Sequence, residues 1–301
     1  MVRSLPFSYR ACGLTIASEL ELSGVPEGAG EPDVFVRRGA VPRSLEAPTA
    51  QGVLFEAARD QYLLCLEGTA RYLVRQGREI IVEADRDSRD PLFRAIFFGS
   101  VLTALLHQRG VLVLHGGIVV GAHGAVILAG NSAAGKSTTL AALVLSGFRV
   151  LADDLAAVSP GSGGGVTVQP SVPHLALWQD AVARLGLADQ GLARARADAG
   201  KYLLPVPSNI APGPEPLAGI VILELNNGRE VTKERLRDSA LFTAVRAQTR
   251  NLLVVKGLEL LESHFRLVAT IADRVPVWRV TRPNGVDSVE PVVAQLMPLL
   301  E

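Results

Sequence analysis

The chain has 301 residues, of which 48% are apolar, so it can bury a full core and is not expected to be disordered. Lys and Arg together number 30, as do Asp and Glu, which excludes a global field that would attract nucleic acid or an anionic membrane. The two cysteines lack disulfide-framework or metal-site spacing, and no apolar run reaches the length of a membrane helix. With an N-terminus that lacks a signal-peptide pattern, these features predict a cytoplasmic protein without nucleic-acid or membrane partners.

Residues 1–88 are predicted to form a β-rich N-terminal domain. Short runs such as "GVLFEA", "QYLLCLEG" and "EIIVEA" are separated by Gly, Asp and Arg, a spacing typical of an antiparallel meander. The charged stretch "DRDSRDP" at residues 85–91 breaks this pattern and marks a boundary. We find no catalytic cluster in this part. Its presence beside a catalytic domain makes substrate docking the role we expect for it.

Residues 89–301 are predicted to form an α/β domain with a mixed sheet. Residues 92–109 are expected to form a largely buried helix, followed by the strands "VLVLHGGIVV" and "AVILAG", which the tight turn "GAHG" joins. From Ala125 to Asp153, the order strand, glycine loop, helix, strand has the length of a right-handed β-α-β crossover. Farther along, a helix is predicted for "LALWQDAVARLGL", strands for "LAGIVILEL", "REVTKERL" and "VPVWRVTRP", and mainly helix for residues 238–274.

The stretch "GNSAAGKS" fits the phosphate-loop pattern GxxxxGK[ST] in full. Glycines let backbone N–H groups approach phosphate oxygens, and the helix that follows points its N-terminal amides at the same anion. Lys136 would supply a mobile positive charge to the outer phosphates, and Ser137 a hydroxyl for a phosphate-bound Mg²⁺. The pattern predicts a nucleotide site made of Gly130, Asn131, Ser132, Ala133, Ala134, Gly135, Lys136, Ser137 and Thr138.

Two adjacent acids, Asp153 and Asp154, end the next predicted strand in "FRVLADDLAAV". Because side chains alternate across a strand, only one of the two can reach a metal at the loop, and the other can turn toward a different group. One carboxylate is therefore expected to bind the metal and the other to act as general base for a hydroxyl. A lone histidine on an apolar strand, such as His115, is more often a core residue, but its place beside the loop strand makes it a candidate.

The segments "LHGGIVV", "GNSAAGKSTTLAAL" and "GFRVLADDLAAV", in this order and spacing, resemble the HPr kinase/phosphorylase group, whose catalytic domain is similar to phosphoenolpyruvate carboxykinase. The resemblance covers residues 93–160 with specific motifs and continues more weakly through "VPVWRVTRP". It implies ATP or another phosphate donor with Mg²⁺ at the loop, one Asp acting on a serine hydroxyl, the other holding the metal, and the His supporting the first. By matching position, these roles fall on Asp153, Asp154 and His115. Which Asp has which role is left open by the resemblance, and we favour Asp153 for the metal and Asp154 for the base.

Two departures separate this chain from the bifunctional enzymes of that group. A stretch like "LEIRGLG" follows their Asp pair, whereas the corresponding "VTVQPSVPHLALW" contains no acid before Asp180, and the N-terminal part differs as well. The chain is therefore more similar to the HPr kinase-related proteins of modified-peptide gene clusters, which include lasso-peptide serine kinases. These departures leave the reverse phosphorylase activity open, and the acceptor does not carry over. Because assembly is common in the group, a homo-oligomer is open as well.

Two classes of function fit these residues. The first, which we predict, is an ATP- and Mg²⁺-dependent kinase acting on a serine or similar hydroxyl of a peptide, a protein or a small metabolite. The second is a nucleotide-binding ATPase or regulatory module without phosphotransfer, although neither an LSGGQ-type cap nor an NKxD-type base reader occurs. Several cations could contact the transferred phosphate or an acidic substrate, or could equally line exposed helices: Arg184, Arg194, Arg196, Lys201, Arg246 and Arg250.

Overall fold

Two compact units make up the chain, Met1–Val113 with Arg250–Leu267 and Leu114–Thr249 with Val268–Glu301. The computed structural model describes residues 5–161, 163–172, 175–196, 199–205 and 213–301. Helices and mixed sheets occur in the chain together, so the predicted mixed α/β class is confirmed. The first unit includes the helices that follow residue 90, because they pack on its sheet. The domain boundary at residues 88 and 89 stays a prediction.

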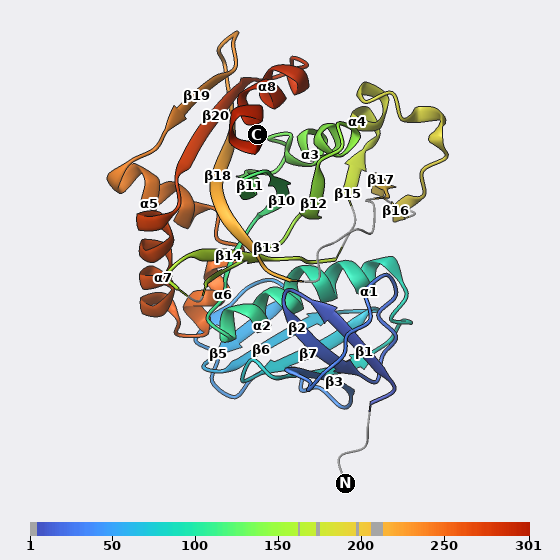
Figure 1. Ribbon diagram of the computed structural model, residues 1–301. Helices are drawn as coiled ribbons and strands as arrows, with labels where there is room; N and C mark the ends of the chain where they lie inside the picture. Colours follow the sequence, from blue (N-terminus) through green and yellow to red (C-terminus); the bar gives the residue numbers. More distant parts are fainter. Residues whose placement is uncertain (1–4, 162, 173–174, 197–198, 206–212) are drawn as a thin grey trace. The chain divides into compact units, whose positions relative to one another are not determined.

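The first unit is built on an eight-stranded sheet of order β1-β2-β3-β8-β7-β6-β5-β4 (Figure 1). Its strands are β1 (Phe7–Ala11), β2 (Leu14–Ser18), β3 (Val34–Arg38), β4 (Ala50–Gln51), β5 (Phe55–Ala58), β6 (Gln61–Leu66), β7 (Ala70–Arg75) and β8 (Glu79–Ala84). Strands β4 to β8 form the predicted antiparallel meander. The all-antiparallel expectation is wrong for β3, which pairs in parallel with β2 and β8. Parallel neighbours need a long connection, and residues 19–33 supply it between β2 and β3.

A helical segment packs on this sheet where the sequence predicts a helix over residues 92–109. Its parts are α1 (Pro91–Ile96), the π-helical turn η1 (Phe97–Val101) and α2 (Leu102–Gln108). The segment begins at Asp90, whose carboxylate accepts hydrogen bonds from two first-turn amides at 2.8 and 3.3 Å. The rings of Phe93 and Phe97 lie against Tyr72 of β7, with centroids 5.4 and 6.4 Å apart. These aromatic contacts hold the helical segment on the sheet.

Two more helices follow in the C-terminal half, α6 (Leu252–Gly257) and α7 (Leu261–Arg274). Helix α6 packs so closely on β4 and β5 that a Cβ added at Gly257 would lie 2.6 Å from the Cβ of Ala57. On α2, the buried imidazole of His107 places Nε2 2.8 Å from the carbonyl oxygen of Arg250. Burial lowers the pKa of His107 to about 4, so the ring is neutral at physiological pH.

The second unit is built around strands in the order β12-β10-β11-β18, with β20 and then β19 continuing from β18. The strands of this part of the chain are β9 (Leu112–Leu114), β10 (Gly116–Gly121), β11 (Gly124–Gly130), β12 (Arg149–Ala152), β13 (Ala156–Pro160), β14 (Val166–Gln169), β18 (Glu215–Asn226), β19 (Thr232–Arg235) and β20 (Val277–Pro283). Strands β11, β18 and β20 run parallel, so their carboxyl ends meet at one edge of the sheet. The turn "GAHG" joins β10 and β11 as the predicted antiparallel hairpin.

Two expectations for this sheet need correction. The crossover from β11 through α3 does not reach a neighbouring strand, because β10 lies between β11 and β12 and is antiparallel to both. In a simple crossover, β12 would pair with β11. The short hairpin places β10 in that position instead. The apolar run "VLVLHGGIVV" is two strands rather than one: the chain breaks at His115, whose backbone N–H donates to the carbonyl oxygen of Gln248 at 2.8 Å.

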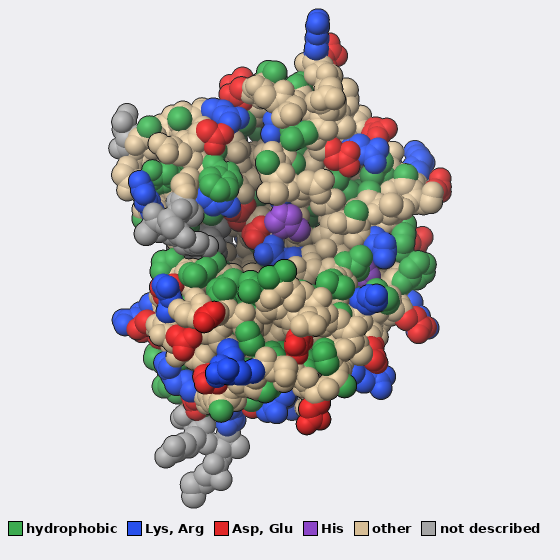
Figure 2. Space-filling view, turned by 180° about the vertical axis from the view of Figure 1, so that it is seen from behind, with side chains coloured by type: hydrophobic (Ala, Val, Ile, Leu, Met, Phe, Trp, Pro, Cys, Tyr) green, Lys and Arg blue, Asp and Glu red, His purple; other side chains and the backbone are tan. Residues whose placement is uncertain are grey.

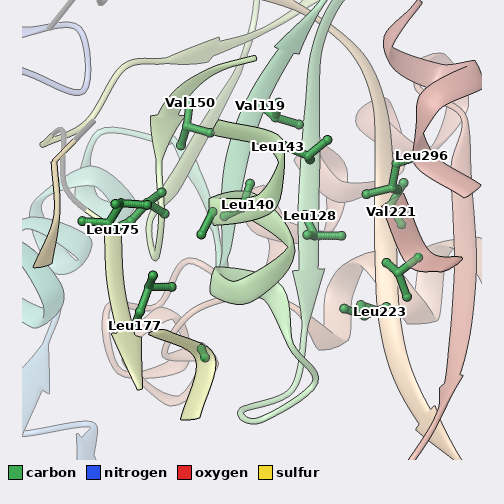
Figure 3. Packing of buried hydrophobic residues seen from close by; sticks show 14 of the residues in the cluster. Val119, Leu128, Leu140, Leu143, Val150, Leu175, Leu177, Val221, Leu223 and Leu296 are labelled. Atoms are coloured by element: carbon green, nitrogen blue, oxygen red, sulfur yellow. The ribbon is translucent and has the colours of Figure 1, made fainter. Parts of the chain in front are cut away.

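The core of the second unit lies between this sheet and helices α3 and α8. Its helices are α3 (Lys136–Leu145), α4 (Gln179–Arg184), the 3-10 turn η2 (Ala188–Gln190), α5 (Asp238–Ala247) and α8 (Val289–Leu300). Figure 3 shows Leu140 and Leu143 of α3 among Val119, Leu128 and Val150 of the sheet. Each fully buried leucine stabilises the fold by about 1.5–3 kcal/mol. This packing fixes the N-terminus of α3 at the edge where β11 ends.

A small antiparallel sheet of order β15-β17-β16 flanks the core. Its strands are β15 (Leu175–Trp178), β16 (Arg194–Arg196) and β17 (Ala199–Leu204). The sequence predicts one helix over "LALWQDAVARLGL", but its first four residues form β15 and α4 begins only at Gln179. Pairing with β17 and burial of Leu175 and Leu177 outweigh the local helix preference here.

Candidate active site

The glycine loop connects the end of β11 to the start of α3, as the sequence pattern requires. Gly130 has a φ of 144°, and a Cβ there would lie 2.3 Å from the carbonyl oxygen of Leu223, so only glycine fits. At the other end of the loop, Gly135 has a φ of 100° and precedes the first residue of α3. Between them, Asn131, Ser132 and Ala133 are exposed. The loop therefore offers its backbone at the N-terminus of a ten-residue helix, where an anion is favoured.

Lys136 lies beneath the loop, and its side chain is buried. The ammonium donates hydrogen bonds to the carbonyl oxygens of Gly130 at 2.8 Å and Asn131 at 3.0 Å. These bonds keep the positive charge at the start of the loop. A phosphate seated there would lie within reach of the same ammonium group.

Asp153 lies directly after β12 and is linked to α3 by a hydrogen bond. Ser137 Oγ donates to one carboxylate oxygen at 2.9 Å, and the Ala176 N–H donates to the other at 3.0 Å. Burial raises the pKa of Asp153 to about 6, although both hydrogen bonds lower it; the charge of Asp154 raises it further, and the charge of Lys201 lowers it. The carboxyl group thus titrates near neutrality, which is typical of functional sites.

The residues at this point fit a magnesium ion by the chemistry of their donors. The hydroxyl of Ser137 and the carboxylate of Asp153 are hard oxygen ligands already within hydrogen-bond distance of each other. Among the described residues, no group of three or more His, Cys, Asp or Glu side chains could hold a metal on its own. Mg²⁺ is commonly held by one or two protein oxygens together with waters and substrate phosphate oxygens, which the Ser137 and Asp153 pair fits.

The side chain of Asp154 points to a different partner from that of Asp153. Its carboxylate lies 3.2 Å from Nδ1 of His115, at the break between β9 and β10. Asp154 is 60% exposed and His115 33% exposed, so the pair can be reached by a substrate. The two adjacent acids therefore serve two groups, as the alternation of side chains predicts. The general-base and metal-binding roles assigned to them stay predictions.

The other cations named from the sequence lie at several places. Arg184 pairs with Asp180 on the exposed side of α4, and the guanidinium of Arg194 lies 5.9 Å from the ring centroid of Tyr202. Arg246 is exposed on α5, and Arg250 belongs to the first unit. The side chain of Arg196 lies outside the described residues. Of this group, Arg184 is near the loop, because it lines a small cavity with Gly135 and Thr138.

Besides Lys136, two more cations act on the site, and one of them does not follow from the sequence. Lys201, which was among the candidates, lies 4.8 Å from the ring centroid of Trp178, and its charge lowers the pKa of Asp153. Arg282 was missed: its Nε donates to the carbonyl oxygen of Ala134 in the loop at 2.7 Å. The available signal is a cation at the end of a predicted strand, directly before a proline, in "VPVWRVTRP". Only the order of strands in the sheet shows that this strand end lies beside the loop.

The surface shown in Figure 2 carries acidic and basic side chains side by side, in keeping with the equal numbers of the two in the sequence. Within the part of the chain that the structure describes, no helix is both long enough and apolar enough to cross a bilayer. Partner classes, including the predicted absence of nucleic-acid binding, stay predictions.

Comparison with solved structures gives a likeness of fold. No family model and no curated protein matches the chain. Among solved structures, the chain is similar to the Hpr(Ser) kinase/phosphatase from Coxiella burnetii, with 11% sequence identity and a TM-score of 0.28, over 62% of this chain and 96% of that one. This likeness is a weak one and concerns the fold alone.

Proposed function

We propose that this chain binds ATP with Mg²⁺ at the glycine loop and transfers the terminal phosphate to a hydroxyl group. The observation that carries the proposal is the placing of two acids beside one phosphate loop. Asp153 is hydrogen-bonded to the Ser137 hydroxyl, and Asp154 is paired with His115. A loop that only binds nucleotide needs the first arrangement, whereas the second supplies a base for an acceptor.

The donor would be held by the loop and by α3. Backbone amides of the loop and the N-terminus of α3 would bind the phosphate oxygens, and the Lys136 ammonium would exchange its two carbonyl partners for the outer phosphates. Ser137 and Asp153 would hold the metal. When bound, Mg²⁺ neutralises part of the charge on the phosphates during transfer.

The acceptor would be activated by Asp154. Its carboxylate takes the proton of the acceptor hydroxyl as the acceptor oxygen forms a bond to the terminal phosphorus, and the bond from that phosphorus to the bridging oxygen breaks to leave ADP. The imidazole of His115, 3.2 Å from the carboxylate, would keep Asp154 in place for this step. A serine of a peptide or protein is the acceptor we favour, and a small hydroxyl metabolite is the alternative.

Transfer of labelled phosphate tests the proposal. Wild-type protein, Asp154→Asn and the control Asp273→Asn, which removes an exposed acid from α7, would be incubated with γ-labelled ATP and Mg²⁺. The acceptors would be serine-containing peptides, proteins and hydroxyl metabolites. We expect Asp154→Asn to bind ATP with little change and to lose transfer at least about thousandfold, roughly 4 kcal/mol of barrier, while the control behaves as wild type.

One result would count against phosphotransfer, and another against Asp154 as the base. If the label appears only as inorganic phosphate with every acceptor, the chain is an ATPase. If Asp154→Asn transfers phosphate at the wild-type rate, that residue is not the base.

A further inference from the structure

Arg282 approaches the glycine loop from a distant part of the sequence. It is the next-to-last residue of β20, which runs parallel to β18, and β18 runs parallel to β11. In register, Arg282 lies opposite Leu225 and Gly130 lies opposite Leu223 on the same strand β18. The end of β20 therefore meets the loop at the edge of the sheet, although 152 residues separate Gly130 and Arg282 in the sequence.

The guanidinium of Arg282 holds two carbonyl groups of the loop. Its Nε donates to Ala134 O at 2.7 Å, and Nη2 donates to Ala133 O at 3.4 Å. Its Nη1 donates to Pro283 O at 3.4 Å and to Ser288 Oγ at 3.5 Å. The planar fork is thus anchored at the loop on one side and at the β20–α8 connection on the other.

Lys136 and Arg282 hold opposite ends of the loop. The Lys136 ammonium binds carbonyl oxygens at the start of the loop, and Arg282 binds those at its end. The lysine would change partners when a phosphate arrives. Arg282 holds different carbonyl oxygens, at the other end of the loop, so its bonds can persist with nucleotide bound.

Fixing a carbonyl also fixes the amide that shares its peptide plane. In a trans peptide, the C=O and the following N–H point in opposite directions. A guanidinium that holds Ala134 O therefore directs the N–H of Gly135 away from itself. Gly135 packs against the guanidinium, because a Cβ there would lie 3.1 Å from Nε of Arg282. The Ala134 N–H is used within the loop, where it donates to Asn131 O at 3.2 Å.

The charge of Arg282 favours an anion at the loop, as do its hydrogen bonds to the loop carbonyls. Burial and then the charge of Arg184 lower the pKa of Arg282, while Asp287 raises it, yet a guanidinium stays charged throughout the physiological range. The hydrogen bonds of this guanidinium go to carbonyl and hydroxyl oxygens, which leave the positive charge in place. This charge adds to the field at the N-terminus of α3, where an anion is favoured.

We propose that Arg282 is a positioning residue of the phosphate loop: it orders the end of the loop so that the Gly135 amide faces the phosphates before nucleotide arrives. The proposal rests on the proposed function, because it takes the loop to be a phosphate site. An arginine that only supported folding would lower stability when removed without a selective loss of nucleotide affinity.

Three variants test this role: Arg282→Ala, Arg282→Lys and the matched control Arg279→Ala. Arg279 belongs to the same strand and pairs with Glu224 and Glu234. Calorimetric titration with a non-hydrolysable ATP analogue and Mg²⁺ would give affinities. We expect Arg282→Ala to bind the analogue roughly ten- to a hundredfold more weakly than wild type. Arg282→Lys should recover only part of the affinity, because an ammonium group lacks the planar array of N–H donors of a guanidinium. The affinity of Arg279→Ala should stay within about twofold of wild type.

Amide hydrogen exchange without nucleotide gives a second measurement. We expect the peptide that contains residues 131–137 to exchange faster in Arg282→Ala than in wild type or Arg279→Ala. Wild-type affinity in Arg282→Ala, or equal weakening in the control, would overturn the proposal. If Arg282→Ala does not fold, unchanged affinity and exchange in Arg282→Lys overturn it as well.

The two measurements separate this proposal from phosphotransfer. If the wild type binds the analogue but transfers no phosphate, phosphotransfer fails and Arg282 is judged on affinity and exchange alone. If the wild type does not bind the analogue, the positioning role falls together with the nucleotide site.

Discussion

Helix α1 of the first unit and helix α3 of the second begin in opposite ways. The carboxylate of Asp90 accepts hydrogen bonds from the first-turn amides of α1, and Pro91 occupies its first position. Helix α3 begins after Gly135, and among the described residues no side chain caps it. Both helix ends favour an anion, but α1 supplies its own, whereas α3 leaves that position open to a ligand. An uncapped helix end is informative here because Lys136 and Asp153 lie beside it.

A second contrast concerns one shifted titratable group in each unit. Burial favours the neutral form of both: it lowers the pKa of His107 to about 4 and raises that of Asp153 to about 6. His107 bonds to a backbone carbonyl and lies among helices, whereas Asp153 bonds to a hydroxyl at the loop and neighbours a second acid. A shifted pKa alone therefore does not mark a site; its surroundings do.

The largest expected difference between the two units is in catalysis. Asp153→Asn removes the metal-binding charge that we propose, so the rate of phosphate transfer should fall at least about thousandfold, roughly 4 kcal/mol of barrier. His107→Gln should leave the rate per folded molecule within about twofold. Initial rates at saturating ATP and Mg²⁺ would measure both, and equal losses in the two variants would contradict the contrast.

The pH dependence of stability should have opposite signs in the two units. Folding lowers the pKa of His107, so the neutral imidazole contributes to the free energy of unfolding above pH 6.5. That contribution, about 3 kcal/mol, is lost as the pH falls to about 4. Folding raises the pKa of Asp153, so its protonated carboxyl contributes to the free energy of unfolding below the normal pKa of 3.8. That contribution is lost as the pH rises through about 6.

Urea unfolding between pH 4 and 7 would measure these contributions, with His107→Gln and Asp153→Asn as references. The wild type should lose stability relative to His107→Gln toward acid, and relative to Asp153→Asn toward neutral pH. Metal binding at Asp153 would require its charged form, so affinity for Mg²⁺ with the ATP analogue should rise with pH through about 6. A flat affinity profile would argue against Asp153 as a ligand.

Placing a carboxylate in the first turn of α3 should supply a negative charge at its open end, as Asp90 does at the start of α1. Thr138 lies in the first turn of α3, so Thr138→Asp should stabilise the nucleotide-free protein by about 0.3–1 kcal/mol and weaken nucleotide binding by about tenfold or more. Thr243→Asp, on an exposed position of α5, adds the same charge elsewhere and should change affinity little. Calorimetry and thermal unfolding would show whether the two effects have opposite signs.

The smallest effect is expected at the helix that is already capped. Asp90→Ala removes the carboxylate that accepts two amides of α1 and should cost about 1 kcal/mol of stability. Nucleotide affinity should not change. A loss of affinity would show that the first unit takes part in nucleotide binding, which the contrast between the helix ends does not anticipate.

The parts of the site that are local in sequence could be predicted from it. The glycine loop, Lys136 and Ser137 follow from one pattern flanked by an apolar run and a helix. The different directions of Asp153 and Asp154 follow from the geometry of a single strand end. In each case a few neighbouring residues determine the structure.

The parts that depend on strand order could not be predicted. Strand β10 lies between β11 and β12 because it forms a hairpin with β11. The residues of β11 and β12 do not show that another strand separates them. The contact of Arg282 requires knowing that β18 joins β11 to β20. The break at His115 does not show in the sequence because the apolar run continues on both sides of it. Strand β15 is predicted as helix because it pairs with β17, where even the nearest pair, Trp178 and Lys201, is 23 positions apart in the sequence.

The internal bonds of Lys136 have a consequence for how a ligand would enter. Since the ammonium is already withdrawn from water and bonded to backbone oxygens, an incoming phosphate would replace those oxygens rather than strip a hydration shell. Mobile ions also screen such a sheltered charge less than one on the surface. Binding should therefore weaken less with added salt than it would with a solvent-exposed lysine, and the empty loop should keep its shape between one ligand and the next.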